Sequence, residues 1–578
     1  MIKSIQTENW LPVMRKIFFV LALAFLAAVI VACCGYLLSD RSQLVAWYLH
    51  LNGCFYRSAY WSTSFFTPGI KSDGNMYCII AIIIAINGIF YIGKYIIPSR
   101  QSKTNTPPIT FNTNNALPVL LCILSGIGFW LWGNGIALPA YDEVFSAQNA
   151  AGIHPFQCIS YYMLPNNHLL FNFINATLFH WAGDKIETGR IISLAAYCSL
   201  LIMMFYWFQK FTQSRWLSLL AAITVGLQFQ VWGFSFQARG YELYLLAEWS
   251  LVISLLSYLL SFKKEWLYVN ILSCAAGYFC MPSFFYLHAA EIVFILLYCL
   301  FYKKKVITIW KAQVTAILLT FLLYLPVLCF SGLDTIAKNG YVAPIFAFQK
   351  ASESVFLSWM FLAFAPNISN IFSDVHWHNI SFNMLLYLLP LVLLFNRKKK
   401  QDVLFGMFYM VMWLVFLFIA IYMRRLPFGR NLIGHNSITL VGVLFTAMWI
   451  THFNTLNKKS LPTRRVIFAF VLALFSVHFF GTNKMYLKDT LYEYDVNKSY
   501  TEVSSGLSFL PPGSSAAFSN EAFYCLYISR RNSVTVSKCL NGGEDYFIKQ
   551  RDERLPVLAT DKYILVKEFD PYEVYKRK

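Results

Sequence analysis

The stretch GIALPAYDEVFSAQNAAG (residues 135–152) places two adjacent acids, Asp142 and Glu143, directly after a long apolar run. That run, residues 117–137, is long enough to cross a bilayer, which takes about 20 apolar residues. A carboxylate at the edge of the hydrocarbon is costly unless it is paired or used. The stretch therefore indicates a membrane protein with a site at the boundary of its membrane body.

The composition of the whole chain supports this interpretation. Of 578 residues, 58% are hydrophobic and only 13% are charged, whereas soluble proteins carry about 25% charged residues. The net charge of +19 comes from short basic clusters between apolar runs rather than from one basic domain. Polytopic membrane proteins distribute their basic residues in this way. We therefore expect membrane lipids around the chain and no nucleic acid as a partner.

The apolar runs predict thirteen membrane spans, with the N-terminus in the cytoplasm. The spans cover residues 16–38, 76–97, 117–137, 190–208, 216–234, 242–261, 266–281, 284–302, 309–330, 382–396, 403–422, 434–452 and 465–480. Basic residues gather in alternate loops, which the positive-inside rule places in the cytoplasm together with the N-terminus. The segment after Asp142 and residues 482–578 are then on the outer side.

The predicted fold class is an α-helical polytopic membrane protein with a small outer α/β domain. The membrane body covers residues 1–481, and two long outer loops, 138–189 and 331–381, interrupt it. The outer domain covers residues 482–578. It is too short and too poor in acid–base clusters to be a catalytic domain by itself.

Local patterns predict elements in the outer parts. Residues 159–181 alternate apolar and polar side chains at helical spacing, which predicts one or two amphipathic helices lying in the outer interface. In the C-terminal domain, SAAFSNEAFYCLYISR (515–530), SVTVS (533–537) and KYILVKEF (562–569) are rich in β-branched and aromatic residues. Such runs are typical of strands.

The cysteines raise two questions. Arg15 and Lys16, an apolar stretch and then Ile30 to Cys33 have the form of a bacterial lipoprotein signal, although an ordinary first span explains them more simply. Cys525 and Cys539 lie in the outer domain, where an oxidising compartment permits a disulfide. Their spacing alone does not show whether the geometry fits.

Further polar residues accompany the acids on the outer side. They include one histidine, several arginines that break the positive-inside pattern, and a tyrosine beside one of them. Each arginine alone is also explained as a snorkelling or structural side chain. Together they indicate an anion site, because a guanidinium binds phosphate through a planar fork. The residues are His168, Arg190, Arg239, Tyr241, Arg424, Arg425 and Arg430.

A metal site is only weakly indicated. Asp374, His376 and His378 have D-x-H-x-H spacing in the second outer loop, in SDVHWHN (373–379). Chance and interfacial placement explain most such triplets. We therefore expect no required cofactor, and a divalent metal is compatible with the sequence but not indicated by it.

The order of these elements resembles that of the GT-C membrane glycosyltransferases, of the protein O-mannosyltransferase and lipid A aminoarabinose transferase type (glycosyltransferase family 39-like). The shared elements are an acidic pair in the first large outer loop, an arginine that opens the next helix, and AR-x-Y in a short outer turn. The resemblance covers residues 117–300 well and the rest by layout. Two departures are Asn166–Leu169, where many relatives read His-Pro-Pro, and the two additional spans before residue 117.

The resemblance implies a hexosyl- or pentosyltransferase in the plasma (inner) membrane. It would transfer a sugar from a polyprenyl-phosphate donor to a lipid, glycan or protein acceptor on the periplasmic side. Asp142 and Glu143 would be the catalytic pair, with Asp142 as the general base and Glu143 holding the loop. Arg239 and His168 would contact the donor phosphate, and Arg190 would be phosphate-facing or structural. The lipid phosphate is a good leaving group, so one carboxylate suffices, and attack opposite it predicts inversion.

An alternative is a transporter or flippase for lipid-linked or anionic substrates. Such a protein has ionisable residues deep within its spans and repeated halves. Glu248 and Glu291 are the nearest candidates for such residues, and the sequence shows no repeat. A non-catalytic assembly or sensor protein is a third interpretation, and it would tolerate replacement of Asp142.

Overall fold

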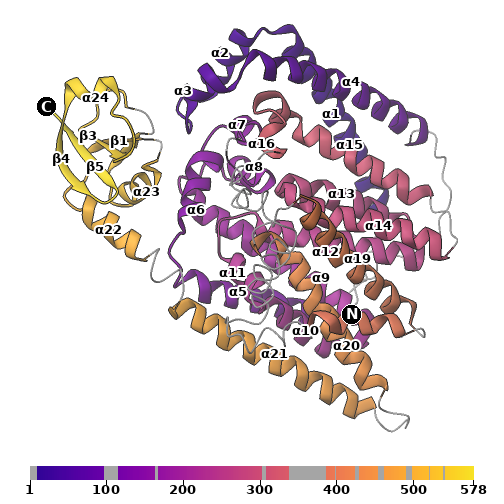
Figure 1. The fold of residues 1–578 in the computed structure, drawn as a ribbon. Coiled ribbons are helices and arrows are strands. Elements are labelled where there is room, and N and C mark those ends of the chain that lie inside the picture. Colours follow the sequence, from indigo (N-terminus) through magenta and orange to yellow (C-terminus); the bar gives the residue numbers. More distant parts are fainter. Residues whose placement is uncertain are drawn as a thin grey trace.

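The chain forms a helical body with a small sheet domain at its C-terminal end (Figure 1). The computed structural model describes residues 10–96, 115–337, 386–453, 461–489 and 497–578, apart from 163, 165–166, 303–306, 397–398, 424–428, 520 and 538–539. Within these residues the predicted fold class, a polytopic helical protein with a small C-terminal α/β domain, is confirmed.

Ten helices in the described residues contain a segment long and apolar enough to cross a membrane. The ten coincide with ten of the predicted spans. They are α1 (Trp10–Leu38), α4 (Pro68–Ile96), α5 (Ala116–Asn134), α9 (Lys185–Thr212), α12 (Tyr241–Ser261), α14 (Phe285–Tyr302), α15 (Ile307–Phe330), α19 (Lys400–Met423), α20 (Ile433–Phe453) and α21 (Leu461–Asp489).

The other three predicted spans are not single helices long enough to cross a membrane, so the predicted total of thirteen spans is not confirmed. The run 216–234 is split into α10 (Arg215–Gly226) and α11 (Phe229–Ser235), which are bent by 76° and count as an eleventh span only if taken together. Helix α13 (Glu265–Cys280) has 16 residues, or about 24 Å, which is short of a hydrocarbon core of about 30 Å. The described part of the run 382–396 ends in the 3₁₀ helix η7 (Leu389–Phe395).

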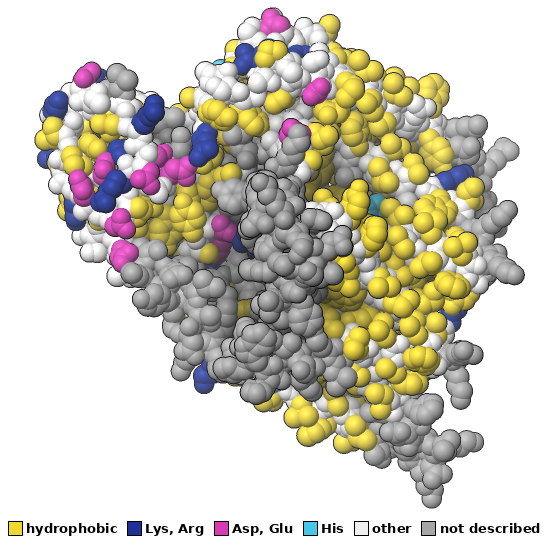
Figure 2. Space-filling view, in the orientation of Figure 1, with side chains coloured by type: hydrophobic (Ala, Val, Ile, Leu, Met, Phe, Trp, Pro, Cys, Tyr) yellow, Lys and Arg dark blue, Asp and Glu magenta, His cyan; other side chains and the backbone are white. Residues whose placement is uncertain are grey.

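The helices differ in how deeply they are buried. In the apolar segment of α20, 83% of the residues are buried, against 17% in that of α4. Apolar side chains of α4 such as Ile79, Ile83 and Phe90 are exposed, as expected for a helix that faces lipid. Figure 2 shows hydrophobic side chains spread over the helical body and charged ones gathered on the C-terminal domain. The chain is therefore an integral multi-pass membrane protein with α12 and α20 near the centre of its body.

Short helices form the segments between the spans. Residues 39–67, which we call the N-terminal arm, join α1 to α4. The first large loop joins α5 to α9, and the helix predicted within residues 159–181 is found there as α8. The arm contains α2 (Arg41–Leu51), α3 (Ser58–Tyr60) and η2 (Trp61–Phe65). The first large loop contains α6 (Tyr141–Ser146), η4 (Ala147–Ala151), α7 (Pro155–Ser160) and α8 (Leu169–Leu178). The other short helices are η5 (Pro282–Phe284), α16 (Asp334–Ala337) and η8 (Gly429–Leu432).

The C-terminal domain is built on a five-stranded sheet of order β2-β1-β3-β5-β4. Strand β1 pairs in parallel with β2 and β3, whereas β5 pairs antiparallel with β3 and β4. Its elements are α22 (Asn497–Leu507), β1 (Ser515–Phe518), α23 (Phe523–Arg531), β2 (Thr535–Ser537), β3 (Tyr546–Gln550), α24 (Val557–Lys562), β4 (Tyr563–Phe569) and β5 (Tyr572–Arg577).

The strand prediction for residues 515–530 is right only for its first four residues. Residues 523–531 form the helix α23, although the aromatic residues and isoleucine there favour strands. Every side chain of α23 from Phe523 to Ser529 is buried, so tertiary packing outweighs the local preference. The strands predicted at 533–537 and 562–569 are found as β2 and β4.

The disulfide between Cys525 and Cys539 that the sequence left open is not formed. Cys525 is a free, fully buried thiol on α23, where it packs among the apolar side chains of its own domain, including Phe518 and Val574. Cys539 lies outside the described residues. A disulfide does occur at Cys54, in the N-terminal arm.

Candidate functional site

Helix α6 carries both acids and points their side chains in different directions. It starts directly after Pro139 and Ala140, and the Glu143 carboxylate accepts a hydrogen bond from the Ala140 N–H at 2.9 Å. This contact is one half of a capping box, and acids in a first helical turn are favoured by the helix dipole. Adjacent residues on a helix point about 100° apart. Asp142 and Glu143 therefore reach different surroundings.

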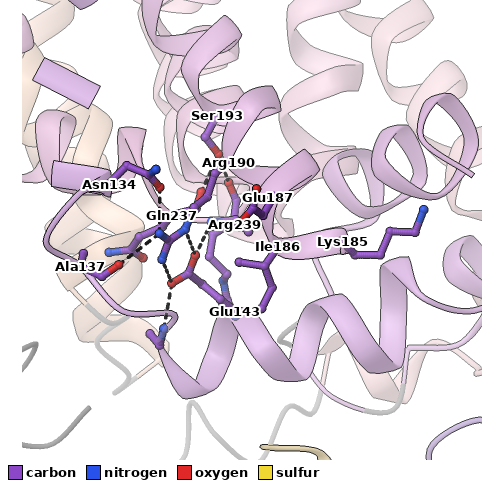
Figure 3. Close-up of polar contacts among 12 residues, drawn as sticks. Asn134, Ala137, Glu143, Lys185, Ile186, Glu187, Arg190, Ser193, Gln237 and Arg239 are labelled. Carbon is purple, nitrogen blue, oxygen red and sulfur yellow. Dashed lines mark hydrogen bonds and ion pairs between the residues drawn. The ribbon is translucent and has the colours of Figure 1, made fainter. Parts of the chain in front are cut away.

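Glu143 forms a buried ion pair with Arg190 (Figure 3). The Arg190 Nε donates to Oε1 and its Nη2 donates to Oε2, both at 3.1 Å. The Glu143 side chain is fully buried and Arg190 is nearly so. Such a two-point pair fixes both side chains in one geometry, so Arg190, in the second turn of α9 (Lys185–Thr212), is locked to α6.

The same pair ties together the elements around it. Arg190 Nη1 also donates to Asn134 Oδ1 at 2.8 Å and to the Ala137 carbonyl at 3.1 Å, at the end of α5. The N–H of Ala238, in the short turn before α12, donates to Glu143 Oε1 at 2.6 Å. The stretch from the end of α5 to α6, helix α9 and the turn before α12 are thereby joined at one carboxylate–guanidinium pair.

The turn that carries Arg239 is held against α9. Ser193 Oγ donates to the Gln237 carbonyl at 2.6 Å. A Cβ placed on Gly189 of α9 would come within 2.8 Å of the Ala238 side chain, so a glycine is needed for this close approach. The turn is therefore fixed to the same helix as Arg190.

Asp142 points toward two arginines from other elements. Arg430 Nη1, on η8 just before α20, donates to Asp142 Oδ2 at 3.0 Å. Arg239 Nη1 lies 3.8 Å from the same oxygen and donates to the Asp142 carbonyl at 2.9 Å. The Asp142 and Arg430 side chains are each 41% exposed, whereas Arg239 is buried. The carboxylate thus stands at an accessible place between two positive charges.

His168 lies behind Arg239. Its Nε2 accepts a hydrogen bond from Arg239 Nη2 at 3.0 Å, and its ring stands edge-on to Tyr241 with centroids 4.8 Å apart. Burial lowers the pKa of His168 well below its usual value, and the charges of Arg239 and Arg430 lower it further. The imidazole is therefore neutral near pH 7 and holds the guanidinium as an acceptor.

A chain of amides fixes the loop that leads to His168. Ser146 Oγ donates to Asn172 Oδ1 at 3.0 Å, and Asn172 Nδ2 donates to Asn167 Oδ1 at 2.9 Å. Asn167 Nδ2 in turn donates to the carbonyls of Cys158 and Tyr161. Asn167 lies within the stretch Asn166–Leu169 that the sequence analysis names, whereas Asn134 and Asn172 were not predicted, because amides in a loop have many ordinary roles.

The structure brings together most of the predicted site residues. Asp142, Arg239, His168, Tyr241 and Arg430 form one group, and Glu143 with Arg190 forms the adjoining buried pair. The other predicted residues lie outside the described residues: Arg424, Arg425, Asp374, His376, His378 and Cys539. In the part of the chain that the structure describes, there is no group of three His, Cys, Asp or Glu side chains that could hold a metal ion.

No protein family model matches the chain, and no curated protein is significantly similar to it. Among solved structures, the chain is similar to ArnT from Cupriavidus metallidurans bound to undecaprenyl phosphate, with 11% identity and a TM-score of 0.45 over 79% of this chain and 97% of that one. The apo state of ArnT gives 12% and 0.42 over the same shares. The archaeal oligosaccharyltransferase AglB from Archaeoglobus fulgidus, in complex with an inhibitory peptide and a dolichol-phosphate, gives 10% and 0.42 over 81% of this chain and 74% of that one.

Both enzymes are of the GT-C class that the sequence motifs resemble. Likenesses of such low identity and TM-score assign neither residues nor an activity to this chain.

Proposed function

We propose that this protein transfers a sugar from a polyprenyl-phosphate donor to an acceptor at the outer face of the membrane, with Asp142 as the general base. The observation that carries the proposal is the accessible Asp142 carboxylate, 3.0 Å from Arg430 and 3.8 Å from Arg239. A base next to two guanidinium groups at the end of apolar helices suits a substrate that has a hydroxyl acceptor and a lipid-anchored phosphate.

The reaction uses one proton transfer and one displacement. The Asp142 carboxylate takes the proton of the acceptor hydroxyl, and the acceptor oxygen attacks the anomeric carbon of the donor sugar. The bond from that carbon to the phosphate oxygen breaks, and its electron pair stays on the lipid phosphate. Attack opposite the leaving phosphate inverts the configuration at the anomeric carbon. The phosphate is a good leaving group, so no general acid is needed to protonate it.

The arginines take different parts in this proposal. Arg430 is accessible and would bind the donor phosphate, exchanging the Asp142 carboxylate for a phosphate oxygen. Arg239 adds a second fixed positive charge beside it, where it stabilises the charge that develops on the leaving phosphate. His168 and Tyr241 hold Arg239 in place. Arg424 and Arg425 stay predicted phosphate contacts, whereas the pairing of Arg190 with Glu143 favours a structural role for both.

The outer orientation has support that is independent of the positive-inside rule. Cys54 is disulfide-bonded, and disulfides persist in oxidising compartments such as the periplasm. Cys54 lines a small cavity together with Phe518 and Phe523 of the C-terminal domain. The N-terminal arm and the C-terminal domain therefore share one side of the membrane, which we propose to be the periplasmic side of an inner membrane.

The proposal is tested with purified protein and polyprenyl-phosphate sugars. Asp142→Asn should lower the rate of transfer by about 10²- to 10⁴-fold, the usual contribution of a general base. Arg239→Ala should lower it by about 10²- to 10³-fold, as does the loss of a charge-stabilising donor. The matched controls are Asp570→Asn and Arg551→Ala, which change exposed side chains of the C-terminal domain. Wild-type rates for both site variants would refute the mechanism, and a retained anomeric configuration in the product would refute inversion.

The buried acids of the membrane body favour a transporter or flippase as the second candidate function. Glu248 and Glu291 are fully buried in α12 and α14. Glu291 Oε1 accepts a hydrogen bond from Asn270 at 2.7 Å, and Asn270 is linked through Gln313 to His288. Intramembrane networks of this kind occur along ion and proton pathways. Uptake of a lipid-linked sugar into vesicles without transfer, abolished by Glu291→Gln, would favour this candidate over the transferase.

A further inference from the structure

The C-terminal domain packs directly on the helix that carries Asp142. Tyr141 and Phe145 are four residues apart on α6, so they lie on one face of the helix. Both contact Phe523, the first residue of α23, with ring centroids 4.5 Å and 5.0 Å away. Their tilted and edge-on geometries are those that aromatic pairs prefer. One side chain of the C-terminal domain therefore touches both ends of α6.

The contact extends into an apolar core that the two parts share. Val144 and Ala147 from the first loop and Ile186 from α9 are buried in the same cluster as Phe523 and Leu526 of α23. These segments are the ones that hold Glu143 and Arg190. The C-terminal domain is thus packed against the framework of the site and not only joined to the end of α21.

The N-terminal arm contacts the same junction, and its helix α3 lies near the C-terminal domain in Figure 1. The Tyr56 ring is 5.2 Å from that of Phe145, and its hydroxyl donates to Glu521 Oε1 at 2.7 Å. Arg57 pairs with the same oxygen at 3.0 Å. Arg57 is about half exposed, so this ion pair adds little stability and mainly fixes the orientation of the domain against α6.

Helix α6 depends on these contacts for its orientation. It has only six residues, and isolated helices shorter than about 12 residues are marginal in water. The buried pair of Glu143 with Arg190 anchors one face, and the aromatic contact with α23 covers another. A general base displaced by about 1 Å can cost about a hundredfold in rate.

We propose that the C-terminal domain positions Asp142 through Phe523, which holds α6 by its contacts with Tyr141 and Phe145. Phe523 is thereby a positioning residue that does not touch the substrate. The inference rests on the proposed function, because it gives Phe523 a part in the transfer that Asp142 starts. It also gives the C-terminal domain and the N-terminal arm a common role, which is to clamp the catalytic helix.

The test compares two buried phenylalanines of the same domain in the full-length protein. Phe523→Leu removes the ring that contacts α6. Phe547→Leu is the matched control, because Phe547 on β3 is equally buried but lies in a separate cluster with Ala517, Ala559 and Tyr563. We expect Phe523→Leu to lower kcat by about ten- to a hundredfold with the KM for the donor unchanged, and Phe547→Leu to leave both constants as in the wild type.

A second measurement does not depend on activity. Amide hydrogen exchange over residues 141–151 should be faster in Phe523→Leu than in the wild type and unchanged in Phe547→Leu. Unchanged exchange in Phe523→Leu, or an equal loss of kcat in both variants, would overturn the inference. If the wild type transfers no sugar but the exchange of residues 141–151 responds as expected, the proposed function fails while the positioning of α6 by Phe523 stands.

Discussion

Glu143 and Asp142 are neighbours on α6, but their carboxylates form two different kinds of ion pair. The Glu143 oxygens are fully buried and accept hydrogen bonds from Arg190, Ala238 and Ala140. The Asp142 carboxylate is 41% exposed, and its closest arginine, Arg430, is equally exposed. A buried pair with its donors arranged around it is fixed, whereas an accessible pair can exchange one partner for another. This difference supports a structural role for Glu143 and, within the proposed function, the role of general base for Asp142.

The largest loss of stability is expected for Glu143→Ala. The substitution leaves the buried Arg190 guanidinium without its counter-charge, which typically costs about 3–5 kcal/mol. The free energy of unfolding in detergent, measured with a denaturant, should fall by this amount. The double variant Glu143→Leu, Arg190→Met removes both charges and should recover most of the loss. A Glu143→Ala protein as stable as the wild type would show that this pair is not structural.

The sequence predicts different roles for the two acids, but it does not predict the contacts around them. The helical angle of about 100° between adjacent residues indicates that the side chains of Asp142 and Glu143 reach different surroundings. The pairing of Glu143 with Arg190 is a contact between residues 47 positions apart, and no local pattern specifies it. In the same way, hydropathy found ten of the spans, but it could not show that α10 and α11 are bent or that α13 is short.

The contact between α6 and α23 was missed for a physical reason. The aromatic residues of α23 favour a strand by local preference, and the helix forms because it is buried between the sheet and α6. The i, i+4 spacing of Tyr141 and Phe145 did carry a signal, because two aromatic residues on one face of an outer helix need a partner. That signal does not say which distant segment supplies the partner.

A smaller loss of stability is expected when His168, which holds Arg239, is crowded by a substitution at Gly240. A Cβ on Gly240 would lie 2.8 Å from His168 Cβ and Nδ1, so Gly240→Ala must displace His168 from Arg239. Overpacking of this kind costs about 1–3 kcal/mol. Both the thermal stability and the rate of sugar transfer should fall. Gly233→Ala is the control, since a Cβ there meets nothing within 4 Å, and equal behaviour of the two variants would contradict the expected displacement of His168.

The lowered pKa of His168 predicts how the stability of the folded protein changes with pH. Burial and the two arginines lower the pKa of His168 in the folded protein, while an unfolded histidine has a pKa of about 6.5. As the pH falls below about 6.5, the unfolded chain binds a proton that the folded chain does not, so stability is lost. The loss is at most about 1.4 kcal/mol per pH unit.

The control for this prediction is His168→Gln, which keeps an acceptor for Arg239 and does not titrate. The wild type should lose stability relative to His168→Gln as the pH is lowered from about 7.5 to 5.5, as measured by denaturant unfolding. The other histidines titrate equally in both proteins and cancel in the difference. A difference in unfolding free energy that stays constant over this range would mean that the folded site does not exclude the proton.

The smallest effect on stability is expected for Arg430→Ala, although its effect on activity should be large. Its pair with Asp142 is accessible, and such pairs contribute about 0–1 kcal/mol, so the unfolding free energy should hardly change. The catalytic efficiency with the donor should nevertheless fall about tenfold or more, since one charged hydrogen bond to a phosphate is worth about 1.5–3 kcal/mol. Arg430→Lys keeps the charge without the planar fork and should lie between. Loss of stability without loss of activity would reverse the roles of the two pairs. A pair that costs little to open is the one whose arginine can leave its carboxylate for the phosphate of a substrate.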